Sequence, residues 1–88
     1  MLTRFKHKRV IITGGASGLG KALVEAFAKL QWKIAVADVN LQGAQEVAEQ
    51  ANQAGAEAIA VFCDVSKDED FVKVAKLLKS KWDGIDII

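Results

Sequence analysis

The residues best suited to chemistry form a glycine-rich run near the N-terminus, Thr13-Gly14-Gly15-Ala16-Ser17-Gly18-Leu19-Gly20. The β-branched run Val10-Ile11-Ile12 precedes it, and an amphipathic helical pattern follows it. The first turn of a helix carries backbone N–H groups without intrahelical partners and the positive end of the helix dipole. Phosphate oxygens can accept hydrogen bonds from these groups where no side chain stands in the way. The order strand, glycine-rich turn and helix therefore favours a phosphate-binding loop.

Three glycines of this run have distinct expected roles. Gly14 allows a tight turn out of the strand, Gly18 lets the backbone approach a phosphate, and Gly20 lets the helix pack closely on the sheet. The spacing G-x-x-x-G-x-G differs from the G-x-G-x-x-G of the standard dinucleotide fingerprint. Taken alone, the motif also fits a plain turn between a strand and a helix, so the surrounding elements must decide.

A carboxylate closes the second apolar run, which we expect to be a strand over Lys33–Val39. Asp38 follows Gly20 at close to the roughly 20 residues expected for the acid that holds an adenosine ribose. A carboxylate at this position accepts hydrogen bonds from the ribose hydroxyls and repels a 2′-phosphate, which favours NAD over NADP. The alternative is that Asp38 only begins a turn, because Asp before Asn is common turn chemistry.

A second carboxylate, Asp64, closes a third expected strand over Ala58–Cys63 and is followed by Val65. At this strand end a carboxylate could lie near an adenine amino group, and an Asp that only caps a turn is an equal alternative. Cys63 is most simply a small core residue.

Three amphipathic helices are expected between the strands. Asn40 is a plausible N-cap for the second helix, and Gly55 suits the position just after its end. Ser66 and Glu69 form the S-x-x-E capping box of the third, which Asp83-Gly84 ends. The predicted buried faces are Leu19, Ala22, Leu23, Ala26, Phe27 and Leu30 in the first helix, Leu41, Ala44, Val47, Ala48 and Ala51 in the second, and Phe71, Val74, Ala75, Leu78 and Trp82 in the third.

The alternation of these elements predicts an α/β fold with the order β-α-β-α-β-α-β, in which Ile85-Asp86-Ile87-Ile88 begins the fourth strand. Short connections and right-handed crossovers make the sheet parallel. We expect the strand order 3-2-1-4, which is half of a doubly wound Rossmann-type fold with the glycine run at the switch point. The first two helices should cover one face of the sheet and the third the other.

Composition restricts the function classes. The 88 residues hold 12 Lys and Arg against 11 Asp and Glu, so the charge balance gives no reason to expect nucleic acid or an acidic membrane surface as a partner. No apolar run approaches the roughly 20 residues of a membrane span, and the basic N-terminus is not a signal peptide. One cysteine permits no intrachain disulfide, which fits the cytoplasm. The single histidine has no partners for a metal site, and we expect none.

The combined motifs resemble the short-chain dehydrogenase/reductase family from about Lys8 to Ile88. The resemblance rests on T-G-G-A-S-G-L-G, on Asp38 after the second strand, on Asp64-Val65 after the third and on Gly84-Ile85-Asp86-Ile87-Ile88. It implies that the pyrophosphate is lined by Gly14, Ser17, Gly18, Leu19 and Gly20, with Asp38 at the ribose and Asp64 and Val65 at the adenine. Members that use NADP tend to have a basic residue where this chain has Ser17 or Val39.

The same resemblance implies what the chain lacks. Family members carry an Asn-Asn-Ala-Gly stretch in the fourth strand, then a catalytic Ser and a Tyr-x-x-x-Lys pair, whereas this sequence contains no Tyr. We therefore expect one truncated NAD-binding domain over residues 1–88, without catalytic residues and inactive alone, from a parent that transfers hydride between NAD(H) and an alcohol or carbonyl substrate. The alternatives are a non-catalytic nucleotide-binding module and a self-assembling fragment.

An incomplete sheet also has a physical consequence. A fourth strand made of Ile85, Ile87 and Ile88 would be an unpaired apolar edge, and the second sheet face would be only partly covered. We expect self-association through this edge or face.

Overall fold

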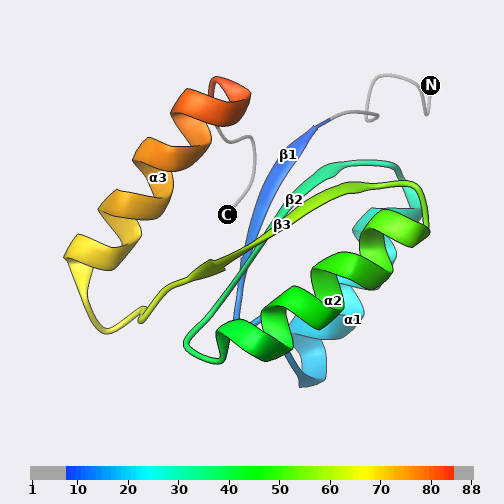
Figure 1. Cartoon of the computed structure of the whole chain (residues 1–88), viewed down its shortest axis with the longest axis horizontal. Coiled ribbons are helices and arrows are strands. Elements are labelled where there is room, and N and C mark those ends of the chain that lie inside the picture. Colours follow the sequence, from blue (N-terminus) through cyan, green and yellow to red (C-terminus); the bar gives the residue numbers. More distant parts are fainter. Residues whose placement is uncertain (1–7, 85–88) are drawn as a thin grey trace.

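The computed structural model describes residues 8–84, in which three parallel strands alternate with three helices (Figure 1). The strands are β1 (Arg9–Thr13), β2 (Lys33–Asp38) and β3 (Glu57–Phe62). They lie in the order β1-β2-β3, and Val10, Ile34 and Ala58 share one register level. This is the 3-2-1 part of the predicted sheet. The predicted fourth strand over 85–88 lies outside the described residues.

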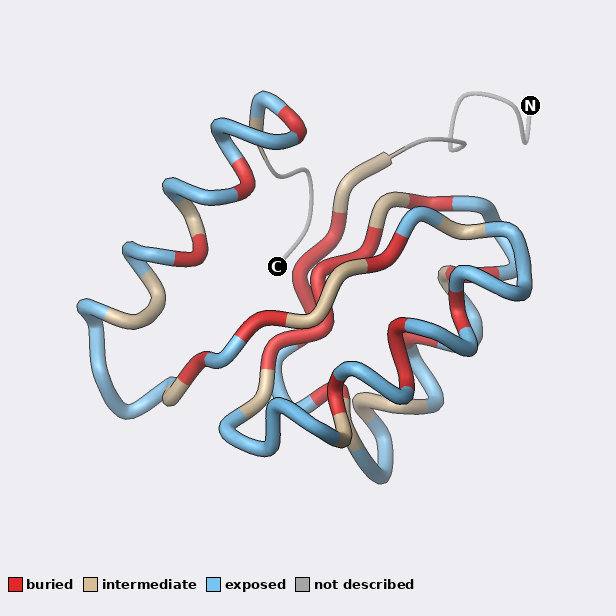
Figure 2. Tube along the Cα trace, viewed as in Figure 1, coloured by how far each residue is buried: buried red, intermediate tan, exposed pale blue. Residues whose placement is uncertain are grey.

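The helices cover both faces of the sheet, as predicted. Helices α1 (Gly18–Lys29) and α2 (Leu41–Gln53) lie on one face, and α3 (Asp68–Trp82) lies on the other (Figure 1). Side chains of β2 alternate between two separate core clusters: Ile34 and Val36 pack toward α1 and α2, and Ala35 and Ala37 pack toward α3. Burial on both faces explains why β2 is apolar without alternation. In Figure 2 the buried segments accordingly follow the strands through the centre of the molecule.

The predicted buried face of α1 is wrong except for Phe27, since the predicted Ala22 and Ala26 are exposed as well as the leucines. Leu19, Leu23 and Leu30 are exposed, whereas Val24 and Ala28 are almost fully buried and Phe27 packs against their cluster. The buried stripe is rotated by one residue, about 100° around the helix axis. Small and β-branched residues on this stripe let α1 approach the sheet closely, and the larger leucines are left on its outer side.

Helix α2 begins and ends nearly as its sequence predicts. Asn40 is the N-cap, and its side-chain oxygen accepts a hydrogen bond from the backbone N–H of Gly43 at 3.0 Å. Gly55 follows the C-cap residue with φ of 106°, which favours glycine. The predicted apolar face is buried except for Leu41, which is exposed in the first turn.

Helix α3 begins differently from its prediction. Its N-cap is Lys67, and no side chain caps the helix. The predicted capping box is therefore wrong: the Ser66 hydroxyl donates to Asp64 at 2.6 Å instead. Three acids in the first turn, Asp68, Glu69 and Asp70, complement the helix dipole in place of a cap. The predicted buried face of α3 is confirmed by Val74, Leu78 and Trp82, with Phe71 packed beside them.

The C-terminal end of α3 is attached to the sheet through Trp82. The indole N–H of Trp82 donates to a Glu57 carboxylate oxygen at 2.7 Å, and its backbone carbonyl accepts from Arg9 at 3.0 Å. Asp83 then ends the helix in the left-handed conformation, with φ of 63°. Trp82 is thus a core residue, as predicted.

Candidate functional site

The carboxyl ends of the three strands meet at one edge of the sheet. Thr13 pairs with Ala37, and Asp38 pairs with Phe62. Just beyond the strands, the backbone N–H of Gly14 donates to the Ala37 carbonyl at 2.8 Å, and the N–H of Cys63 donates to the Asp38 carbonyl at 3.2 Å. The glycine run and both candidate carboxylates are therefore held at the same edge, which is where ligands bind in open parallel sheets.

The glycine run turns sharply between β1 and α1. Gly14 and Gly18 have φ of 67° and 59°, values in the left-handed region that favours glycine. A Cβ at Gly18 would meet no atom within 4 Å, so the backbone there borders open space. The tight turn predicted at Gly14 is confirmed, and the approach of a phosphate at Gly18 stays a prediction for which the open space leaves room.

The close packing at Gly20 differs from its prediction. A Cβ at Gly20 would overlap the carbonyl oxygen of Gly14 and lie 3.0 Å from the Cα of Gly15. The first turn of α1 thus packs on the loop that leaves β1. The residue that approaches the sheet is Gly15, because a Cβ there would lie 2.7 Å from a methyl group of Val36 in β2.

Helix α1 has the N-terminus best suited to an anion among the three described helices. Its N-cap Ser17 makes no side-chain capping bond, and no acidic residue lies in the first turn. By contrast, the Asn40 side chain occupies a first-turn N–H of α2, and three acids surround the start of α3. Unpaired first-turn donors and the positive end of the helix dipole together favour a phosphate group at α1.

Asp38 lies directly beside the glycine run. One of its carboxylate oxygens accepts a hydrogen bond from the backbone N–H of Ala16 at 3.1 Å, and the other accepts from the backbone N–H of Asn40 at 3.0 Å. The second bond is the turn interaction that the sequence offered as an alternative, and the first joins β2 to the loop. Val39 follows with 58% of its surface exposed.

Asp64 forms a turn of its own at the end of β3. Its carboxylate accepts hydrogen bonds from the backbone N–H and the hydroxyl of Ser66, at 3.0 and 2.6 Å. These two bonds lower the pKa of Asp64, and the nearby Lys67 adds to the effect. Val65, which follows, is 65% exposed. The carboxylate is thus kept ionised at the edge of the sheet, one strand away from Asp38.

Cys63 lies under this turn and is only 2% exposed. Burial raises the pKa of its thiol, and the carboxylates of Asp70 and Asp64 raise it further. It is a protonated core residue, as its sequence context predicts, and a poor nucleophile.

Several apolar residues in or next to the loops at this edge are exposed. Leu19 is 77% exposed at the start of α1, in addition to Val39 and Val65. Phe62 is 54% exposed and pairs with Asp38 across the sheet edge. Phe62 was missed by the sequence analysis, as were Ala16 and Gly43. The alternation of Ala58, Ala60 and Phe62 on one face of β3 predicts a core residue at position 62, so the sequence carried no signal for its exposure.

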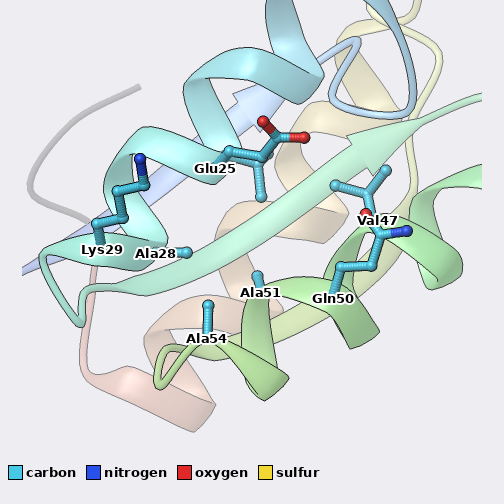
Figure 3. A pocket seen from close by; sticks show the side chains of 8 residues that line it. Glu25, Ala28, Lys29, Val47, Gln50, Ala51 and Ala54 are labelled. Carbon is cyan, nitrogen blue, oxygen red and sulfur yellow. The ribbon is translucent and has the colours of Figure 1, made fainter.

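A groove of about 200 Å³ lies between α1 and α2, away from this edge. Figure 3 shows its lining, in which Glu25 and Lys29 of α1 face Val47, Gln50 and Ala51 of α2. None of the predicted site residues lines it. Within residues 8–84 no cluster of His, Cys, Asp and Glu could hold a metal ion, and none of the helices there is long and apolar enough to cross a bilayer.

Comparison with known proteins gives the family. The model of the short chain dehydrogenase family matches residues 8–88. The chain therefore belongs to the short-chain dehydrogenase family, and its Rossmann-type α/β fold agrees with that membership.

Two relatives show how much of a related protein this chain covers. An uncharacterised oxidoreductase, YuxG, from Bacillus subtilis is 40% identical over 86 residues, which cover 96% of this chain and 12% of that protein. The 7alpha-hydroxysteroid dehydrogenase of Escherichia coli is 32% identical over 85 residues, which cover 97% of this chain and 33% of that enzyme. The chain thus spans a third or less of the length of these relatives.

Solved structures agree with the fold. A hydroxysteroid dehydrogenase from Escherichia coli superposes with a TM-score of 0.88 at 32% identity, over 93% of this chain and 35% of that one. A protein from Haemophilus influenza described as a D-mannonate oxidoreductase, with NAD bound, gives a TM-score of 0.86 at 29% identity, over 93% of this chain and 30% of that one.

Proposed function

We propose that this chain is the NAD(H)-binding part of a short-chain dehydrogenase/reductase, folded as one domain that supplies a portion of a larger enzyme. The observation that carries the proposal is the juxtaposition of the open N-terminus of α1 with the Asp38 carboxylate. Ala16, which donates to Asp38 at 3.1 Å, lies between the glycines of the turn and the first residue of α1. Phosphate donors and a ribose acceptor are thereby adjacent, as an adenosine diphosphate group requires.

Each predicted site residue has a role in this proposal. Gly14, Ser17, Gly18, Leu19 and Gly20 line the pyrophosphate, and the absence of any atom near a Cβ at Gly18 supports a close backbone approach there. Asp38 accepts hydrogen bonds from the adenosine ribose, and Val39 borders it. Asp64 and Val65 lie at the adenine, where the ionised Asp64 carboxylate can accept from an amino group.

The same residues support NAD in preference to NADP. A 2′-phosphate would bring its negative charge next to Asp38. Ser17 and Val39 offer no positive charge to compensate, because one is neutral and polar and the other apolar. The relative with bound NAD supports this assignment.

The parent reaction in this proposal is hydride transfer between NAD(H) and an alcohol or carbonyl compound. The nicotinamide supplies the hydride chemistry when the cofactor is bound. This chain contributes binding and orientation only. It contains no Tyr, the residue type that begins the family's Tyr-x-x-x-Lys pair. We expect no dehydrogenase activity from residues 1–88 alone.

The first experiment is a titration of the purified chain with NADH, with NADPH as the control. Saturable binding that favours NADH is expected, and Asp38→Ala should weaken NADH binding at least about tenfold, as loss of a charged hydrogen-bond acceptor predicts. Equal affinity for NADH and NADPH would contradict the role of Asp38. Absence of binding by both would favour the alternative of a self-assembling fragment.

Self-association and a cytoplasmic setting belong to the same proposal. Exposed Leu19, Leu23 and Leu30 on α1 support association through an apolar helix surface. The free, buried thiol of Cys63 is compatible with a reducing compartment. No observation points to nucleic acid or to a membrane surface as a partner.

A further inference from the structure

Ala16, in the middle of the glycine run, is held by the junction between β2 and α2. Its backbone N–H donates to the Asp38 carboxylate at 3.1 Å. A Cβ placed on Gly43, in the first turn of α2, would lie only 3.2 Å from the Cβ of Ala16. The glycine loop is therefore hydrogen-bonded to Asp38 at the end of β2, and it lies so close to the first turn of α2 that a Cβ added at Gly43 would press on it.

These two points are joined by a continuous chain of hydrogen bonds. The second oxygen of Asp38 accepts from the backbone N–H of Asn40 at 3.0 Å, and the Asn40 side chain accepts from the backbone N–H of Gly43 at 3.0 Å. A displacement of the first turn of α2 is thus transmitted to the Asp38 carboxylate and to Ala16. Glycine at position 43 leaves these hydrogen bonds undisturbed. A larger residue would disturb them, because its Cβ would lie 2.6 Å from the Asn40 amide nitrogen.

We propose that Asp38, Asn40 and Gly43 position the glycine loop for the pyrophosphate, with Ala16 as the residue on which they act. This inference rests on the proposed NAD(H) site and deepens it. Asp38 has two roles: it accepts hydrogen bonds from the ribose, and in the free chain it already holds the loop. Asn40 and Gly43 are positioning residues that act through Asp38 and Ala16.

These interactions restrict the conformations of the glycine loop before any ligand binds. Gly14 and Gly18 can adopt many conformations, so a loop built on them loses much entropy on ordering. The hydrogen bond from Ala16 to the Asp38 carboxylate and the close approach of α2 offset this entropy loss during folding. A loop ordered in advance leaves less entropy to be lost when the pyrophosphate binds.

Amide hydrogen exchange of the ligand-free chain tests the positioning directly. In the parent chain the Ala16 amide should be protected, and Asp38→Ala should raise its exchange rate about tenfold, the size expected for loss of one charge-assisted hydrogen bond. Asp64→Ala removes a similar turn carboxylate at the neighbouring strand and should leave Ala16 exchange unchanged. Amides of β2, such as that of Val36, report whether the fold is intact. Equal Ala16 exchange in the parent and in Asp38→Ala would overturn the proposal.

A steric variant separates loop positioning from ribose recognition. Gly43→Ala keeps the Asp38 carboxylate as a ribose acceptor but presses on Asn40 and Ala16, so NADH affinity should fall about fivefold to tenfold and Ala16 exchange should rise. Gln42→Ala, at the exposed neighbouring position, is the matched control and should change neither. Alanine favours helix more than glycine does, so Gly43→Ala should keep its helical circular dichroism. Unchanged NADH affinity and unchanged Ala16 exchange in Gly43→Ala would refute the role of Gly43.

NADH binding tests the proposed function, and Ala16 amide exchange tests the positioning proposal separately. If the parent chain does not bind NADH, the proposed function is wrong, yet the exchange rates of Ala16 still decide whether the junction holds the loop. If NADH binds but Ala16 exchange is insensitive to both Asp38→Ala and Gly43→Ala, the cofactor site stands and the positioning proposal is wrong.

Discussion

Asp38 and Asp64 end neighbouring strands, yet their carboxylates have different partners. The Asp38 carboxylate accepts from a loop of a different βα unit, and the Asp64 carboxylate accepts from Ser66, two residues further on. Both residues form turns, which the sequence offered as the alternative to ligand binding. At Asp38 the turn and the proposed ligand role coexist, because each carboxylate oxygen accepts more than one hydrogen bond.

Removal of the Ser66 hydroxyl should raise the pKa of Asp64. The hydroxyl makes the largest contribution that lowers this pKa, and the backbone bond from Ser66 remains in Ser66→Ala. A lowered carboxyl pKa stabilises the fold above the unfolded pKa, and this stabilisation is lost as pH falls through the folded pKa. In Ser66→Ala this stabilisation should be smaller, and its loss should be complete at a higher pH. Carboxyl-carbon NMR titration of Asp64 measures the shift, and an unaltered titration curve would count against the hydroxyl as its cause.

At the scale of elements, the start of α1 is packed against the loop that leaves β1. Gly20→Ala should destabilise the fold by about 1–3 kcal/mol, because the new Cβ overlaps the backbone of Gly14 and no flexible side chain can move away. Gly18→Ala makes a useful comparison: its Cβ meets nothing, so only the left-handed φ of 59° opposes it, at about 1–2 kcal/mol. Urea denaturation of both variants gives the two values. NADH binding should be lost in Gly20→Ala together with stability.

Side chains bond to the backbone of β3 at the edge that does not pair with β2. The backbone N–H groups of Glu57 and Cys63 donate to the β2 side of the strand. The backbone groups of the residues that follow them, Ala58 and Asp64, therefore point away from β2. The Asn52 side chain of α2 bonds both the N–H and the carbonyl of Ala58, at 2.6 and 3.0 Å. At the other end, Asp70 accepts from the N–H of Asp64 at 3.1 Å. Side chains therefore cap both ends of this edge, which limits pairing with another chain.

Asn52→Ala should weaken both the fold and this protection. Ala58 is buried, so its two backbone groups would lose their partners at a cost of about 1–3 kcal/mol in the free energy of unfolding. The freed edge should also increase aggregation, measured by light scattering at equal protein concentration. Gln53→Ala, one residue along α2, provides the comparison. Stability equal to that of the parent would show that water replaces Asn52 without cost.

In the whole molecule, helix α1 has an apolar surface that the rest of the described chain leaves exposed. Leu19, Leu23 and Leu30 are exposed on the side of this helix that faces away from Val24 and Ala28. Edge pairing through the predicted fourth strand lies outside the described residues. The helix surface is thus the better-supported route to self-association among residues 8–84.

Leu23→Glu together with Leu30→Glu should therefore shift the chain toward monomer without unfolding it. Both side chains are exposed, and charged residues on an exposed helical stripe oppose apolar association. Sedimentation velocity at several concentrations measures the distribution. A parent chain that is monomeric at every concentration would contradict the expected self-association, and an unchanged oligomer in the double variant would exclude this stripe as its cause.

The order of the elements, the parallel sheet and the positions of the loop residues could all be predicted from the sequence. These follow from local patterns: β-branched runs, glycines in the turns after β1 and α2, and the N-cap Asn40. Such patterns act over a few residues, so they can be read without knowledge of the neighbours.

The buried side of α1 and the contacts of Asp38 depend on tertiary packing and could not be predicted from the sequence. Two apolar stripes on α1 are offset by one residue, and helical periodicity describes the helix alone, without the surface that receives it. The packing of Gly20 on Gly14 and of Val24 in the core selects the second stripe. In the same way, the bond between Asp38 and Ala16 joins residues far apart in sequence, and it exists because parallel pairing brings the ends of β1 and β2 together.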